Sequence, residues 1–222
     1  MEREMQASEL ETLEEARRIA AAIRAALPKE VDAVKQGITH KTLFYLIVAR
    51  ESLLHRVSGL ADDTFSLIDA GQNLGAAILS RSMLESTAVL GFLLRSVEAF
   101  ERTNDVSALY RRVAKVVVGS RTGDEGDPVS VHVLDAIRDS DARLPVPGLM
   151  RLYENLSEYA HPNWSGLLGT FGTHESALLV RLGGQPRAIP ALGPYLTIIL
   201  SSFDHLYGIL GEEFEAVARK LQ

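Results

Sequence analysis

Apolar residues recur at steps of three and four along much of the chain, which is the spacing of amphipathic helices. The pattern first appears over 9–27, where Ser8 and Glu11 match a capping box and Pro28 ends the helix. Because the rest of this segment is charged, we expect the N-terminal amphipathic helix (1–28) to lie at the periphery or to pair with a second subunit. Its narrow apolar stripe consists of Leu10, Leu13, Ala16 or Ala20, Ile23 and Leu27.

The longest helical pattern covers 62–102 and predicts a central helix. Asp62 and Asp63 suit the positive end of a helix dipole, and they mark the expected start. The stretch 76–94 is apolar almost all round, as in a helix surrounded by others. We therefore expect the remaining helices to pack around this one.

Shorter helices are predicted on both sides of the central one. Gly59 ends the helix before it, and Pro194 suits the first turn of the last helix. The segment 119–128 holds three glycines and a proline and is the clearest loop. The predicted shorter helices cover 29–36, 39–57, 105–118, 129–138, 149–159 and 194–220.

Helical periodicity disappears over 161–193, where glycine and proline become frequent. Residues 176–182, followed by Gly183 and Gly184, have the pattern of a strand and a turn. Pro186 weakens the returning strand. A small β-hairpin is the structure that this segment favours.

The composition fits one globular domain over 1–222. The chain has 222 residues, of which 46% are apolar and 23% are charged. Together with the periodicity, this predicts an all-α bundle of five to seven helices, with one long central helix and an irregular segment at 161–193. No stretch reaches about 18 consecutive apolar residues, and the acidic start is not that of a signal peptide. We therefore expect a cytoplasmic protein without a membrane segment.

Charge and cysteine content exclude several classes of chemistry. The chain has no cysteine, which excludes disulfides, thiolate metal sites and cysteine nucleophiles. Its formal net charge of −6 argues against a general affinity for nucleic acid. A local basic patch from Arg111, Arg112 and Lys115 remains compatible with that charge, although such a trio is usually a solvated helix face.

The most informative polar pair lies inside the most apolar helical pattern. Arg81 and Glu85 are four residues apart, so they share a helix face and can form an ion pair. A charge in such surroundings costs several kcal/mol unless it is paired and hydrogen-bonded. Two interpretations stay open, a buried pair that fixes helix register or a charged site in a cleft of the bundle.

A second polar face ends the helix predicted over 149–159. Tyr153, Ser157 and His161 are each four residues apart and line one side of it. Pro162 ends the helix at His161, where the negative end of the dipole favours a protonated imidazole. His161 is therefore either a cap for backbone carbonyls or a ligand-binding or basic group. We expect it to meet Arg81 and Glu85 in one polar site.

These two segments together resemble a loose group of uncharacterised bacterial helical proteins, some of them thought to be related to the HEPN superfamily. The resemblance rests on Arg-Ser-x-x-Glu at 81–85 and on Tyr-x-x-Leu-Ser-x-x-x-His-Pro at 153–162. It implies a helical bundle with a polar site and no particular activity. HEPN nucleases carry an Arg followed four to six residues later by His, and Arg50 and His55 have that spacing, which chance alone also supplies.

No cofactor or metal is predicted. Glu158 and His161 have the Glu-x-x-His spacing of di-iron bundles, but those sites need two such pairs. A single-metal site that combines His161 with His55 or His205 is not forbidden by any sequence rule. No phosphate loop, dinucleotide fingerprint or hydrolase elbow is present.

The leading functional hypothesis is a non-catalytic binding or regulatory module. Its rivals are a metal-independent ribonuclease of HEPN type that uses Arg50 and His55, and a binder of a small polar ligand inside the bundle. The apolar surfaces of the first and last helices also predict a homodimer, since two-fold dimers are the commonest oligomers.

Overall fold

The computed structural model describes residues 2–120, 128–183 and 188–221. Within them the chain is mostly helical (71%), and a small antiparallel hairpin is the one sheet of the described part. The elements are α1 (Glu2–Ala25), α2 (Lys41–Asp69), α3 (Asn73–Thr103), α4 (Val106–Val117), α5 (Val133–Asp141), α6 (Leu149–Ala160), α7 (Leu168–Phe171), β1 (Gly172–Ser176), β2 (Leu179–Leu182), α8 (Leu192–Glu212) and α9 (Phe214–Leu221).

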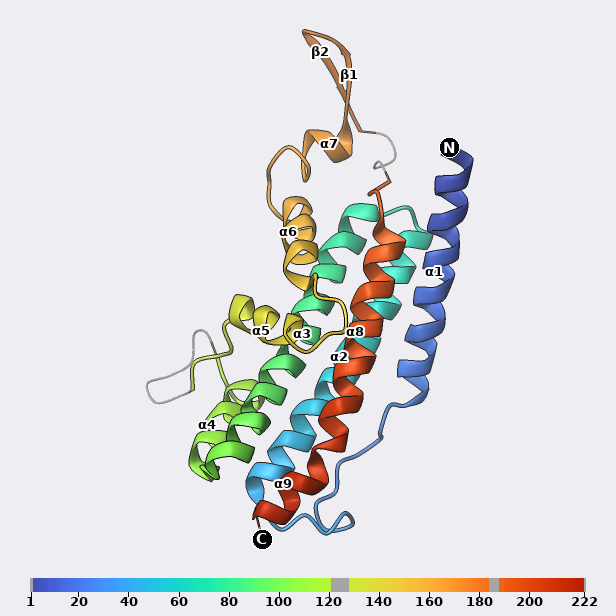
Figure 1. The fold of residues 1–222 in the computed structure, drawn as a ribbon. Helices are drawn as coiled ribbons and strands as arrows, with labels where there is room; N and C mark the ends of the chain where they lie inside the picture. The colour runs from blue at the N-terminus through green and yellow to red at the C-terminus, as the bar shows by residue number, and fades with distance from the viewer. Residues whose placement is uncertain (1, 121–127, 184–187, 222) are drawn as a thin grey trace.

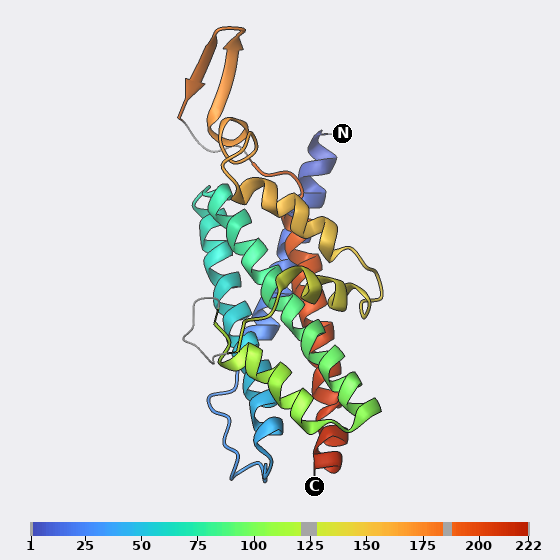
Figure 2. The ribbon, with the colours of Figure 1, turned by 90° about the vertical axis from the view of Figure 1, so that its left-hand side faces the viewer.

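Helix α3 is the centre of the bundle, as its all-round apolar pattern predicts. Helices α2, α4, α5, α6 and α8 all pack against it, and the two ribbon views show it running through the middle of the molecule (Figures 1 and 2). Seven helices of the described chain have nine or more residues, which matches the predicted bundle of five to seven. The fold class expected from the sequence is confirmed.

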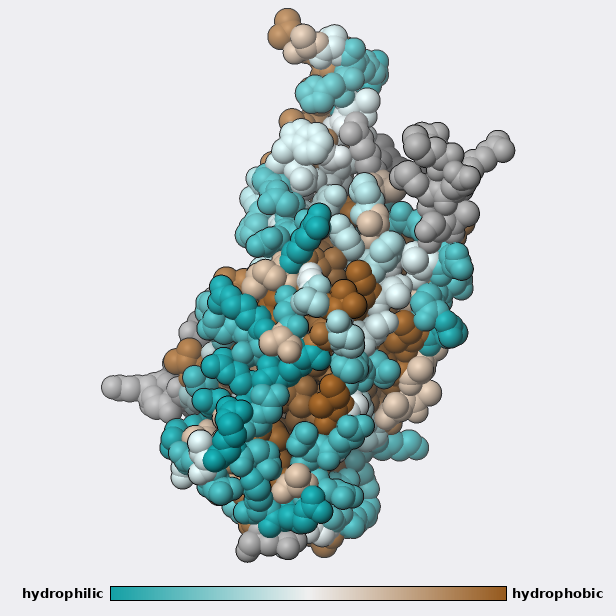
Figure 3. Space-filling model, viewed as in Figure 1, coloured by the Kyte–Doolittle hydropathy of each residue, from teal (hydrophilic) through white to brown (hydrophobic). Residues whose placement is uncertain are grey.

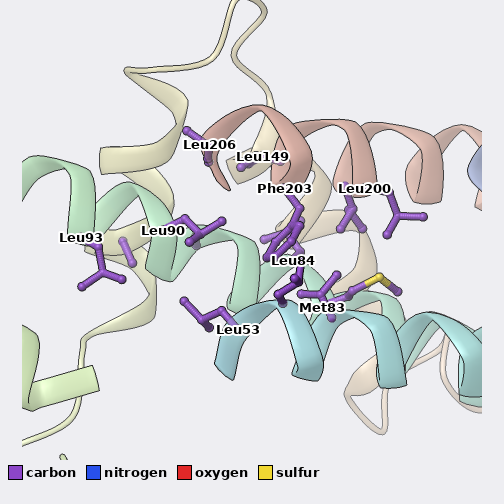
Figure 4. Close-up of a cluster of buried hydrophobic side chains, with 14 of the residues drawn as sticks. Leu53, Met83, Leu84, Leu90, Leu93, Leu149, Leu200, Phe203 and Leu206 are labelled. Carbon is purple, nitrogen blue, oxygen red and sulfur yellow. The ribbon is translucent and has the colours of Figure 1, made fainter. Parts of the chain in front are cut away.

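The core lies where α2, α3, α6 and α8 meet (Figure 4). Phe203 and Leu84 are fully buried there, and a fully buried side chain of this size contributes about 1.5–3 kcal/mol to folding. The labelled core residues are Leu53, Met83, Leu84, Leu90, Leu93, Leu149, Leu200, Phe203 and Leu206.

Hydroxyl groups let α3 carry polar residues through this core. Ser80, Ser86, Thr87 and Ser96 are buried, and each donates a hydrogen bond to the backbone carbonyl four residues earlier, at 2.7–3.0 Å. These local bonds satisfy groups that would otherwise cost free energy when removed from water.

The segment 62–102, predicted as one long helix, belongs to two helices, the end of α2 and nearly all of α3. Helix α2 continues through Gly59 and past Asp62 to Asp69, and the break comes at Gly71, which has a φ of +71°. Burial explains the difference, because Val57, Ala61 and Phe65 continue the apolar face of α2. That burial outweighs the cost of about 1 kcal/mol for one glycine within a helix.

Helix α1 lies at the edge of the bundle, against α8 and α2 (Figure 1). Ala16, Ala20 and Ile23 of the predicted stripe are buried there, whereas Leu10 is 63% exposed. The Thr197 hydroxyl of α8 donates to the backbone carbonyl of Thr12 at 2.8 Å. The part of the α1 stripe from Ala16 to Ile23 is therefore covered by the same chain.

The predicted hairpin exists, with a different register. Residues Leu179–Leu182 form the second strand rather than the first, and they pair with Gly172–Ser176. The turn consequently falls at Ala177 and Leu178, and the predicted turn and return at Gly184 and Pro186 lie outside the described residues. The hairpin projects beyond the end of the bundle in both ribbon views (Figures 1 and 2).

Two other predicted segments differ in detail. The helix expected over 129–138 begins at Val133, and 29–36 forms a turn whose backbone amides bond the Asp32 carboxylate. Most of the loop expected over 119–128 lies outside the described residues. One described helix, α3, is long and apolar enough to cross a membrane, and 61% of its most apolar window is buried within the bundle.

Candidate functional site

Arg81 and Glu85 form the ion pair that their spacing predicts. Arg81 Nε lies 3.3 Å from Glu85 Oε1 on α3, and Arg81 Nη2 donates to the Tyr153 hydroxyl of α6 at 2.7 Å. The guanidinium also lies 4.8 Å from the centre of the Tyr153 ring. The side chains are 22% and 36% exposed, so the expectation of a largely buried pair is wrong for Glu85. The reason is that Glu85 faces a surface hollow.

The other two predicted members of this site have different contacts. The Ser157 hydroxyl donates to the Tyr153 backbone carbonyl at 2.6 Å, within its own helix. His161 is the C-cap of α6, where its backbone amide bonds the Ser157 carbonyl at 3.1 Å. Its side chain is exposed, and among the described residues no hydrogen bond or ion pair joins it to Arg81 or Glu85. The structure brings together Arg81, Glu85 and Tyr153.

Arg50 and His55 of the nuclease hypothesis face different parts of the molecule. Arg50 is packed beneath α8, with its guanidinium 3.4 Å from the centre of the Tyr207 ring and its Nε bonded to the Tyr207 carbonyl at 3.1 Å. It also bonds Glu51 at 2.5 Å. His55 instead lies 2.8 Å from the carbonyl oxygen of Pro28. Arg50 therefore has several structural partners, and none of them is His55.

Glu51 and Tyr207 complete the cluster around Arg50. The Tyr207 hydroxyl donates to Glu51 at 2.7 Å, and the Arg50 and Glu51 side chains are only 16% and 13% exposed. Burial raises the pKa of Tyr207 well above its usual range, and the hydrogen bond to Glu51 adds to this effect. The polar groups of this cluster are hydrogen-bonded to one another, and they link α2 to α8.

A groove of about 660 Å³ lies between α6, α8 and the connector 144–148. We call it the α6–α8 groove. Figure 3 shows apolar surface in the middle of this face, over α8. Its lining comprises Leu144, Pro145, Val146, Pro147, Gly148, Arg151, Leu152, Asn155, Tyr195, Thr197, Ile198, Ser201, Ser202 and His205.

The polar groups of the groove come from two facing helices. Arg151 and Asn155 are one turn apart on α6, and Thr197, Ser201 and His205 are successive turns of α8. The Asn155 side-chain amide donates to the Tyr195 hydroxyl at 3.2 Å, which leaves its other polar atoms for a ligand. Arg151 is exposed, and no described carboxylate lies within ion-pair distance of it.

Sequence reasoning missed this groove, although a signal for it was present. Thr197, Ser201 and His205 recur at four-residue steps in an otherwise apolar helix, and Ser201 and His205 of this stripe are exposed rather than packed in the core. What the sequence does not show is that the proline-rich connector 144–148 folds back to form the opposite wall.

Two smaller hollows lie beside α4. One, of about 280 Å³, is lined by Glu85, Arg56 and Lys115, and Arg56 Nε donates to Ser86 at 3.0 Å. The other, of about 260 Å³, is lined by Arg112, Lys115 and the Arg95–Asp139 pair, among others. Two of the three predicted basic residues of α4 thus face hollows, and Arg111 lies on the exposed surface.

No group of three or more His, Asp or Glu side chains within the described ranges is placed to hold a metal ion. His161 is therefore not part of such a group with His55 or His205. In the comparisons with known proteins, no family model, curated protein or solved structure matches this chain.

Proposed function

We propose that the protein is a non-catalytic binding module, and that the α6–α8 groove holds a small amphipathic molecule with an anionic group. The size of the groove supports this proposal. Its volume of about 660 Å³ falls in the range of about 300–1,000 Å³ that is usual for small-molecule sites. Its lining is largely apolar with a few polar side chains, the common composition of such sites.

The charge of the lining carries the proposal. Arg151 lines the groove, and none of the lining residues is an Asp or Glu. A guanidinium without a carboxylate partner beside an apolar wall favours an anionic group, since charge-assisted hydrogen bonds to Arg are strong and bidentate. His205, on the opposite wall, adds an imidazole ring, which can donate a hydrogen bond to the same group.

The same lining gives little support to catalysis. A serine nucleophile needs a base within hydrogen-bond reach. His205 lines the groove with Ser201 and Ser202, and within the described chain no hydrogen bond joins the imidazole to either hydroxyl. The ribonuclease alternative gains nothing from Arg50 and His55, whose contacts are to separate structural partners. Binding without chemistry is the simpler function for this site.

Two fluorescent probes of similar shape test the proposal. Anilinonaphthalene sulfonate carries an anionic group on an apolar body, and phenylnaphthylamine has a similar body without the charge. We expect the folded protein to bind both. Arg151→Gln should weaken the sulfonate about tenfold, equivalent to about 1.4 kcal/mol, and leave the neutral probe unchanged.

Two further variants locate the binding. Ser201→Trp fills the groove from an exposed position and should weaken both probes, whereas Arg111→Gln removes an exposed charge elsewhere and should weaken neither. Equal affinities in the wild type and Ser201→Trp would place the probes outside the groove. If Arg151→Gln leaves the sulfonate affinity unchanged, the anionic part of the proposal is wrong.

A further inference from the structure

The hairpin has almost no support from the rest of the described chain. Strands β1 and β2 pair with each other, and apart from a contact of β1 with α7 they have no extensive contact with another element. An isolated two-stranded hairpin is marginally stable at best in water. The hairpin therefore needs a further surface to cover it.

The two faces of the hairpin differ in character. Side chains alternate along a strand, so Val180 and Leu182 of β2 lie on one face. Leu182 is 73% exposed, and Leu178, in the turn that precedes β2, is 99% exposed. The opposite face carries Arg181, whose Nε is ion-paired with Glu175 of β1, together with Leu179. The more apolar face is therefore that of Val180 and Leu182, which we call the apolar stripe of β2.

The outer edge of β2 is free to pair. Among the described residues β2 bonds to β1 alone, so its other edge presents backbone donors and acceptors. Such an edge is a template for a strand of another chain. The charges of the ribbon do not oppose the approach of a like ribbon, because Arg181 and Glu175 neutralise each other.

We propose that β2 pairs with β2 of a second copy of this chain, antiparallel, with the two-fold axis at Val180. This register places Val180 opposite Val180 of the partner subunit and Leu178 opposite Leu182 of the partner subunit. The apolar stripes of the two subunits then lie side by side on one face, and the two hairpins form one four-stranded sheet. Three or more strands with an apolar face are what independent stability requires.

Large apolar side chains are exposed on the hairpin and at its base. Trp164 is 64% exposed and Leu167 is 51% exposed, and they lie at the base, where the Gly169 backbone amide donates to the Trp164 carbonyl at 2.7 Å. The other exposed apolar residues of this region are Leu168, Phe171, Leu178, Leu179 and Leu182. Exposed apolar side chains beside a free strand edge favour association with another chain.

This surface differs from the one that the sequence predicts for a homodimer. The apolar stripe of α1 packs on α8 of the same chain, so these helices have less apolar surface left for a partner. On the hairpin, by contrast, Leu178 and Leu182 are 99% and 73% exposed. The proposed dimer is also independent of the ligand proposed for the α6–α8 groove.

Single cysteines test the register, because the chain has none of its own. In Val180→Cys the two thiols face each other across the axis at a Cα separation of about 5 Å, which suits a disulfide. In Leu182→Cys the equivalent residues are about 14 Å apart along the paired strands. Thr173→Cys lies on β1 and on the polar face. Under mild oxidation we expect disulfide-linked dimers from Val180→Cys and monomers from the other two.

Sedimentation velocity supplies an independent readout. The wild type should sediment as a dimer at micromolar concentration, and Val180→Lys should sediment as a monomer with unchanged helical circular dichroism. A monomeric wild type, a dimeric Val180→Lys, or equal crosslinking of the three cysteine variants would each overturn the proposal. A Val180→Cys variant that fails to crosslink while the wild type is dimeric would place the interface elsewhere.

Discussion

Two of the arginine–glutamate pairs of the bundle, Arg50–Glu51 and Arg81–Glu85, show how the surroundings of an ion pair decide what it contributes to stability. Arg50 and Glu51 are enclosed by α8, and each has a second partner in Tyr207. Glu85 lines a surface hollow and is 36% exposed, whereas Arg81 is 22% exposed and its buried Nε makes no hydrogen bond within the described chain. Solvent screens the second pair and hardly reaches the first. The two ion pairs should therefore contribute differently to the free energy of unfolding.

Removing the carboxylate from each pair should therefore give unequal losses. Glu51→Ala leaves Arg50 enclosed without its counter-charge and should lower the free energy of unfolding by about 2–3 kcal/mol. Glu85→Ala should cost about 1 kcal/mol or less, because that pair is partly exposed. Urea unfolding monitored by circular dichroism measures both. Equal losses would show that the two environments are not energetically different.

The phenol of Tyr207 predicts a dependence of stability on alkaline pH. Burial raises the pKa of Tyr207 above its usual value, so the folded state holds this proton more tightly than the unfolded chain does. The resulting stabilisation is complete below the ordinary tyrosine pKa of about 10, and it is lost as the pH rises above that value. Burial also raises the pKa of Tyr159, which acts in the same direction.

We expect the free energy of unfolding to fall as the pH rises above about 10, and to fall less steeply in Tyr207→Phe. Denaturant titrations at fixed pH values measure the two slopes. Parallel slopes for the wild type and Tyr207→Phe would exclude a stabilising role for this proton. At neutral pH, loss of the hydroxyl bond to Glu51 should cost the variant about 1 kcal/mol.

At the scale of residues, the sequence predicts partners that are three or four positions apart in one helix. It does not predict partners that the fold brings together from distant positions. Arg81 and Glu85 are four apart, and their pairing follows from helix geometry. Arg50 and the Tyr207 carbonyl are 157 residues apart, and nothing local connects them. Arg151 was overlooked because its significance depends on the facing helix and the connector.

Among the elements, the contact between α3 and α5 depends on one glycine. A Cβ at Gly91 would lie 2.6 Å from the Cα of Ser140, and the Ser140 hydroxyl donates to the Ala88 carbonyl at 3.0 Å. The two backbones are thus too close for any side chain at position 91. Periodicity marks Gly91 only as a tolerated helix residue, since the approach of α5 has no local signature.

Gly91→Ala should consequently destabilise the protein by about 1–3 kcal/mol, because the two helices must move apart. Gly59→Ala is the matched control, since Gly59 lies within α2 and has open space around its Cα. That substitution should stabilise by about 0.5–1 kcal/mol. Thermal melts of both variants measure the contrast. A neutral Gly91→Ala would mean that α5 is not held against α3 in solution.

The boundaries of the elements were harder to predict than their existence. Helix-terminating residues such as Gly59 and Asp62 compete with burial, and in α2 the continuing apolar face prevails. The hairpin strands alternate too briefly for the sequence to fix which segment comes first. By contrast, Pro28 and Pro162 follow helices that end near the expected residues, since proline restricts the backbone directly.

At the scale of the whole molecule, the fold is a helical body with a projecting hairpin, and the two parts should be separable. Replacement of residues 173–182 by a short Gly–Ser linker removes contacts that are mostly internal to the hairpin. At dilutions where the wild type is monomeric, the melting temperature and helical circular dichroism should match those of the full chain. A large drop in melting temperature would show that the hairpin supports the bundle.

The packing of α1 on α8 has a consequence for the order in which the chain folds. Helices α2 and α3 are neighbours in sequence and can dock as soon as both exist, whereas α8 begins about 170 residues after α1 ends. At translation rates of about 5–20 residues per second, α8 is synthesised roughly 10–30 s after α1, and until then α1 lacks the helix that covers its apolar stripe. During that interval Ala16, Ala20 and Ile23 face solvent, so the nascent chain is most open to aggregation and to chaperones before its last helices emerge.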